Sequence, residues 1–115
     1  MSAQSISLLT LVRTLSATAA ASRLLTPAGA LAGAGENSIG VTRTGGVSGD
    51  KVPVDALGTA VVESGAAITI NDTLKSDSTG RAITWVTSGA KVGLALQAAS
   101  AAGEFIEVLL IPNVA

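Results

Sequence analysis

The segment Phe-Ile-Glu-Val-Leu-Leu-Ile-Pro, residues 105–112, gives the strongest strand signal in the chain. Its end is almost continuously apolar, which is typical of a strand whose two faces are both covered. The cover could come from the domain's own core or from a neighbouring subunit. Pro112 has no backbone N–H to donate, so we expect the strand ladder to stop there.

Upstream of this segment, turn residues divide the chain into short apolar or alternating runs. Glycine, asparagine and aspartate recur between the runs and supply the backbone conformations that tight turns need. We expect strands at residues 38–42, 51–57, 59–63, 67–70, 81–86, 91–97 and 104–111. Such spacing predicts a mainly β fold, a small barrel or sandwich, with at most one or two short helices. The run Ala98–Ala102 is the best candidate for a helical turn.

The chain also carries an internal repeat, unless the similarity is chance in a sequence rich in alanine and glycine. The matched positions are Gly40 with Gly93, Gly49-Asp50 with Gly103-Glu104, Val52 and Val54 with Ile106 and Val108, Leu25…Gly29 with Leu74…Gly80, and Ser16-Ala17 with Ser64-Gly65. A real repeat predicts one domain over residues 16–115, built from intertwined halves at about 16–57 and 58–111 that share one core.

Residues 1–15 precede this repeat and contain an apolar segment. Ile6 and Leu8 form one alternating set, and Leu11, Arg13 and Leu15 form another, as in a strand. A signal peptide is disfavoured because no positive charge precedes the segment. We therefore expect residues 1–15 to form an edge strand, or an arm that reaches a neighbouring subunit.

The composition favours a protein that works as an oligomer. Hydrophobic residues make up 48% of the chain but aromatic residues only 2%. Each core side chain therefore buries little area. Charged residues account for 13%, about half the usual share of roughly 25%. A small domain of this kind gains stability from a subunit interface. Trp85 could be a core residue or an interface anchor. The candidate interface residues are Ile6, Leu8, Leu11, Leu15, Trp85 and Phe105.

The same composition argues against most chemistry. There is no cysteine or histidine, which excludes disulfides, thiolate and Ser-His-Asp catalysis and the usual zinc sites. The seven basic residues are scattered, so neither nucleic acid nor a membrane is an expected partner. The carboxylates form no recognisable catalytic or metal-binding pattern. Pockets that bind sugars or other small ligands are usually lined by more aromatic residues than this chain has. We expect neither enzymatic activity nor a cofactor.

Several pieces of the chain, taken in order, resemble the capsid cement, or head decoration, proteins of tailed bacteriophages. The pieces are GVTR (40–43), GDKVPV (49–54), LGTAVVESG (57–65), LKSDSTGRA (74–82), VGLALQAA (92–99) and AAGEFIEVLL (101–110). The resemblance covers roughly residues 16–111. Its order is fairly specific, although each piece alone is of low complexity. Residues 1–15 have no clear counterpart in the family.

The resemblance implies a structural protein on the outer surface of the expanded icosahedral phage head. Family members commonly bind as trimers at three-fold and quasi-three-fold positions, where they clamp adjacent major capsid proteins. The expected partners are thus the major capsid protein and further copies of this chain. Another virion component, such as a tail-tube, head-completion or fibre-base module, would share the same β-rich and charge-poor character.

Overall fold

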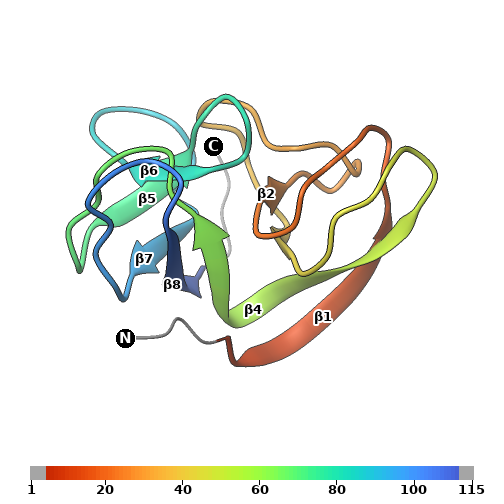
Figure 1. Ribbon diagram of the computed structural model, residues 1–115, viewed down its shortest axis with the longest axis horizontal. Coiled ribbons are helices and arrows are strands. Elements are labelled where there is room, and N and C mark those ends of the chain that lie inside the picture. The colour runs from red at the N-terminus through yellow and green to blue at the C-terminus, as the bar shows by residue number, and fades with distance from the viewer. Residues whose placement is uncertain (1–4, 112–115) are drawn as a thin grey trace.

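A computed structural model describes residues 5–111, and within them the chain forms eight β-strands and no helix (Figure 1). Every pair of neighbouring strands is antiparallel. The mainly β prediction is therefore confirmed. The strands are β1 (Ser7–Thr14), β2 (Leu24–Leu25), β3 (Gly40–Thr42), β4 (Lys51–Glu63), β5 (Thr73–Ser76), β6 (Ala82–Thr84), β7 (Gly93–Ala95) and β8 (Phe105–Leu110).

The strands form one strongly curved sheet. Its order is β2-β3-β4-β8-β7-β5-β6, and β1 pairs with β4 off this path. Ser64, just after β4, forms a parallel bridge with Ala82 of β6. The amide of Gly65 also donates to the carbonyl of Ala82 at 2.8 Å. These contacts bring the end of the sheet back to β4, so the architecture is barrel-like rather than a sandwich.

The long strand β4 connects the two halves of the molecule (Figure 1). Its first part pairs with β1 and β3, and its last five residues pair with β8. The sequence predicts two separate strands here, and that prediction is wrong. Gly58 lies at the change of partner with a φ of +97°, a backbone conformation that residues other than glycine rarely adopt. The glycine lets the strand bend and continue where another residue would end it.

The internal repeat is visible in the hydrogen bonds. Backbone bonds of the first half recur in the second half between matched positions, with the same donors and acceptors. The pairs are Leu15 N to Asp50 O (2.7 Å) with Ser64 N to Glu104 O (2.7 Å), Gly49 N to Leu15 O (2.8 Å) with Gly103 N to Ser64 O (2.8 Å), and Ala19 N to Gly46 O (3.0 Å) with Ile68 N to Ala99 O (2.9 Å). The two halves thus share a pattern of backbone hydrogen bonds that follows the repeat in the sequence. The bonds match Leu15 with Ser64, one residue earlier than the sequence comparison places the correspondence.

The buried side chains form two clusters instead of the single core expected. The smaller cluster lies in the first half and contains Leu15, Ala19, Leu25, Val52 and Val54. The larger cluster fills the second half and also takes in Leu24, Ala32 and Val41 from the first half. Strand β4 contributes side chains to both clusters. Its inward residues before the Gly58 bend lie in the smaller cluster, and those after the bend lie in the larger one. The halves are thus intertwined, but each encloses its own apolar centre.

Some local predictions fail where long-range pairing overrides pattern. The short strands β2 and β5 are missed by the sequence analysis. Residues 67–70 form no strand, and Ile68 makes only an isolated bridge with Ala99. Residues 98–102 form no helical turn, because the backbone of Ala99 is committed to that bridge. The predicted stop at Pro112 lies outside the described residues.

Candidate functional site

Strand β1 presents an exposed apolar edge. Among the described residues it has β4 as its one strand neighbour. Leu8 is 78% exposed, and Ile6, Leu9 and Val12 are exposed as well. An edge strand with free backbone groups and apolar side chains is a ready surface for association. Leu11 is half-buried on the opposite face, which packs toward the molecule.

The outer face of β8 continues this apolar surface. Ile106, Val108 and Leu110 point into the core, whereas Phe105 and Leu109 are exposed at 56% and 39%. Leu109 lies directly opposite Thr59 of β4, whose hydroxyl accepts a hydrogen bond from the amide of Ile6 at 2.8 Å. The start of the β1 region and the outer face of β8 are therefore neighbours. Of the two sources of cover expected for residues 105–112, the chain's own core therefore covers only the inner face of β8.

A shallow pocket of about 410 Å³ adjoins this face. Its lining residues are Ile70, Leu96, Gln97, Ala98, Glu104, Phe105 and Ile106. The Glu104 carboxylate accepts hydrogen bonds from the hydroxyl and amide of Ser100, and these hold the pKa of Glu104 below its usual range. Asp50, its counterpart in the first half, accepts from the amide of Val47 at 2.9 Å in the same way. The acid in the pocket thus closes a turn, as its counterpart does.

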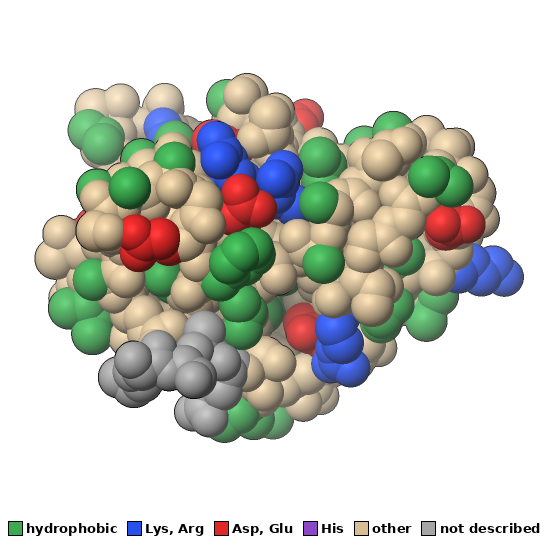
Figure 2. Space-filling view, viewed as in Figure 1, with side chains coloured by type: hydrophobic (Ala, Val, Ile, Leu, Met, Phe, Trp, Pro, Cys, Tyr) green, Lys and Arg blue, Asp and Glu red, His purple; other side chains and the backbone are tan. Residues whose placement is uncertain are grey.

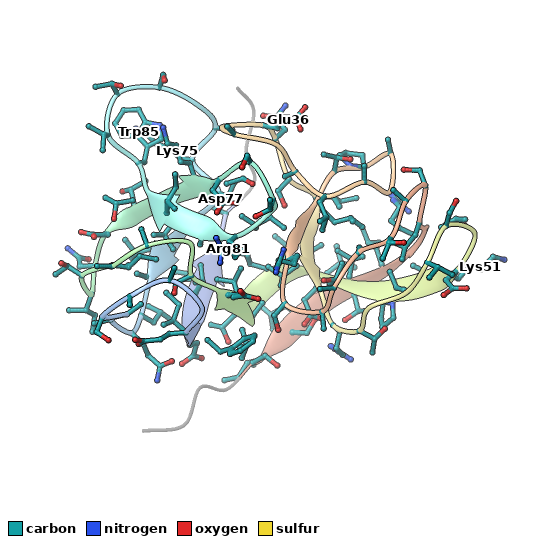
Figure 3. The ribbon with its side chains drawn as sticks, turned by 45° about the horizontal axis from the view of Figure 1, so that its top comes forward. Glu36, Lys51, Lys75, Asp77, Arg81 and Trp85 are labelled. Carbon is teal, nitrogen blue, oxygen red and sulfur yellow. The ribbon has the colours of Figure 1, made fainter. Side chains whose placement is uncertain are left out.

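Trp85 lies at the base of a surface loop, at residues 85–91. The indole is half-buried and belongs to neither core cluster. Its Nε1–H donates to the carbonyl of Gly89 at 2.9 Å, and the Lys91 ammonium lies 4.5 Å from the ring centroid. Figure 3 shows Trp85 beside Lys75 at one end of the molecule. Of the two alternatives for this residue, the core position is therefore wrong.

Four charged side chains meet where the two halves join. Glu63, at the end of β4, lies 3.2 Å from Arg23 and 3.5 Å from Arg81, measured between the nearest charged atoms. Arg81 also lies 3.4 Å from Asp77. Asp77 and Arg81 lie side by side before β6 in Figure 3, and Figure 2 shows acidic and basic side chains gathered on this face. All four are largely buried, and the Arg23–Glu63 pair links the first half of the chain to the second.

We expect Glu63→Gln to lower the free energy of unfolding by about 2 kcal/mol. The amide would leave the partly buried guanidinium of Arg23 without a carboxylate, and that of Arg81 with Asp77 alone. The residual exposure of 17–30% keeps the cost below that of a fully buried pair. Urea denaturation would measure the change. Glu107→Gln is the matched control, since Glu107 lies on neighbouring β8 and takes part in no ion pair among residues 5–111. Equal effects of the two substitutions would contradict the assigned role.

Asp77 makes stability depend on acid pH. Burial raises the pKa of its carboxyl, but hydrogen bonds from the amides of Thr79 and Arg81 outweigh burial, and the net pKa is lowered. A carboxyl with a lowered folded pKa adds stability that is fully present above its unfolded pKa, about 3.9, and is lost as the pH falls through the folded value. We expect the stability difference between the wild type and Asp77→Asn to be constant above about pH 5 and to shrink below about pH 4. A difference that stayed constant down to about pH 2.5 in urea denaturation would contradict this.

The six candidate interface residues separate into distinct environments. Ile6, Leu8 and Phe105 are exposed, while Leu11 and Trp85 are half-buried. Leu15 is 2% exposed and belongs to the smaller core cluster, so it is corrected to a core residue. Leu109 was missed, although the alternation in residues 105–110 places it on the same face as Phe105. Lys75 was also missed, because nothing in the sequence links it to Trp85.

No metal centre or membrane helix is present in the described part of the chain. Among residues 5–111, no three acidic side chains are grouped closely enough to hold a metal ion. The same residues include no helix with the length and hydrophobicity needed to cross a membrane.

Comparisons with known proteins bear on the fold and the family of this chain. The chain is similar to a solved structure described as the head fiber gp8.5 N base in bacteriophage phi29. The likeness has a TM-score of 0.72 at 19% sequence identity and covers 90% of this chain and 93% of that one. At this identity it supports the fold alone. None of the curated proteins matches the chain. The family model described as phage cement protein matches residues 9–110, nearly the whole chain, and the chain therefore belongs to the phage cement protein family.

Proposed function

We propose that this protein decorates the outer surface of the expanded icosahedral phage head and stabilises contacts between neighbouring major capsid proteins. The observation that carries this proposal is the family match over residues 9–110. The surface is consistent with it, because apolar side chains are exposed along β1 and on the outer face of β8. The shifted carboxyls of Asp77 and Glu104 serve an ion-pair network and a turn, which suits a structural role.

The proposal includes self-association, most simply as a trimer on the three-fold positions of the head. The surface offered for it comprises Ile6 and Leu8 with Phe105 and Leu109. Ile6 and Leu109 flank the same residue of β4, so one neighbouring copy could cover both. Contacts of this kind can be individually weak, since repeated contacts on a lattice strengthen one another through multivalency.

Binding to isolated heads tests the proposal. Purified protein would be added to expanded and unexpanded heads that lack it, followed by co-sedimentation and electron microscopy. We expect saturable binding to expanded heads, with density at regularly repeated surface positions, and little binding to unexpanded heads. Light scattering would give the oligomeric state. Absence of density from the head surface would overturn the proposal.

A role as the base of a head fibre is a second candidate. The fold likeness to the phi29 head fiber base favours it. The same images separate the two roles, because a fibre base carries a projecting fibre whereas a decoration protein leaves a low knob. Density confined to a tail or a single vertex would point to another virion component.

A further inference from the structure

The two halves of the molecule differ at one pair of equivalent loops. The first loop is closed by Ala32 N to Leu24 O (2.9 Å) and Ile39 N to Leu25 O (2.8 Å), and the second by Trp85 N to Thr73 O (2.8 Å) and Val92 N to Leu74 O (2.8 Å). Trp85 therefore occupies the position of Ala32. Ala32 is fully buried, whereas the indole of Trp85 remains partly at the surface. Because alanine closes the same loop in the first half, the fold alone does not require tryptophan here.

Hydrogen bonds tie the second loop to its neighbours. The amide of Ala90 donates to the carbonyl of Gly35 at 2.9 Å, and the indole donates to Gly89. The backbones of the two loops touch, since a Cβ on Gly89 would lie 2.8 Å from the Cα of Gly35. Val86, next to the indole, is 69% exposed. An apolar projection that is already held by such contacts loses less conformational entropy on binding, which favours a role as a docking anchor.

Two ammonium groups flank this projection. Lys75 Nζ donates to the carbonyl of Ser88 at 3.2 Å, and Lys91 lies over the indole. Neither lysine forms an ion pair within the described residues, whereas Arg23, Arg43 and Arg81 all do. Glu36, on the neighbouring loop, accepts a hydrogen bond from the amide of Gly33 instead. The loop thus combines a tryptophan with two positive charges that have no carboxylate partner in this part of the chain.

We infer that the loop of residues 85–91, together with Lys75, is the anchor that docks this protein onto the protein shell of the head, at an apolar notch bordered by carboxylates. The inference rests on the proposed function and specifies its contact. Tryptophan is enriched among the residues that dominate binding energy at protein interfaces. The two lysines are complementary in charge to carboxylates on the shell. Such complementarity speeds association and fixes how the two proteins are aligned. Self-association then remains with β1 and β8, on a different part of the surface.

A protein partner is favoured over a phosphate-bearing one. Phosphate backbones are bound by clusters of basic residues, and here there are two lysines in a chain of net charge −1. The exposed Val86 and the indole add apolar area that a protein surface can bury. Carboxylates on such a surface would replace the water around Lys75 and Lys91.

The test measures binding to expanded heads for the wild type, Trp85→Ala and the double variant Lys75→Glu/Lys91→Glu. We expect each variant to bind at least about tenfold more weakly, because each removes one element of the anchor. Wild-type affinity should fall with added salt, and the charge-reversed variant should lose most of that dependence. Lys75→Arg/Lys91→Arg should retain binding. Lys51→Glu is the matched control, because Lys51 is exposed at the opposite end of the molecule (Figure 3).

The outcomes separate this inference from the proposed function. If the wild type fails to bind heads, the proposed function itself is wrong. If the wild type binds heads and both anchor variants bind them as tightly as the wild type does, the inference is overturned. It is also overturned if the variants lose oligomer formation instead of head binding, or if free DNA binds the loop as tightly as heads do. Circular dichroism establishes that each variant is folded. If Trp85→Ala unfolds, the double variant Lys75→Glu/Lys91→Glu still tests the inference.

Discussion

Replacement of Gly58 by alanine is expected to lower the free energy of unfolding by about 4 kcal/mol. The residue has a φ of +97°, and a Cβ there would lie 2.2 Å from the carbonyl oxygen of Ile6 and 3.0 Å from the amide of Leu8. The chain can relieve the clash by moving β1 away from β4, which gives up their pairing. Urea denaturation would measure the loss, and faster hydrogen exchange in β1 would locate it.

Gly49→Ala is the matched control for this substitution. Gly49 has nearly the same backbone angle, φ +94°, but nothing lies within 4 Å of a Cβ built on it. The control therefore carries the conformational strain without the clash, and we expect it to cost about 1–2 kcal/mol. Equal losses for the two variants would show that the close approach of β1 to the bend contributes nothing.

Leu15→Ala is expected to lower the free energy of unfolding by about 3 kcal/mol. The side chain is 2% exposed and packs in the smaller core cluster, so its truncation removes apolar burial and leaves a cavity. Thermal or urea unfolding at a concentration where the protein is monomeric would measure it. Dependence of the loss on protein concentration would instead indicate that Leu15 acts at a subunit contact.

Leu8→Ala provides the comparison with an exposed residue of the same type. Leu8 is 78% exposed on the same segment. We therefore expect its truncation to change monomer stability by at most about 0.5 kcal/mol. Its effect should appear in self-association. A loss comparable to that of Leu15→Ala would mean that Leu8 is covered in the folded chain.

The candidate surface could be only partly predicted from sequence. The sequence marks Phe105 as a large apolar residue, but its pattern does not distinguish cover by the core from cover by a neighbouring subunit. The link between Ile6 and β8 could not be foreseen, since it depends on both lying beside Thr59. The charged junction was equally invisible, because Arg23 and Glu63 are 40 residues apart in the chain. Contacts of that separation are set by strand pairing.

The sequence alone determined the features that depend on amino-acid composition and on the local alternation of apolar and polar residues. The lack of cysteine and histidine removed whole classes of chemistry, and the turn residues together with the matched glycines predicted a repeated β fold. Tertiary structure alone decided which face of each strand is buried. Alternation shows that Leu11 and Leu15 share one face and that Ile6 and Leu8 share the other. It does not show which of the two faces is buried, so the symmetry between them remains. The pairing of β1 with β4 breaks that symmetry, because it turns Leu15 toward the core and leaves Leu8 exposed.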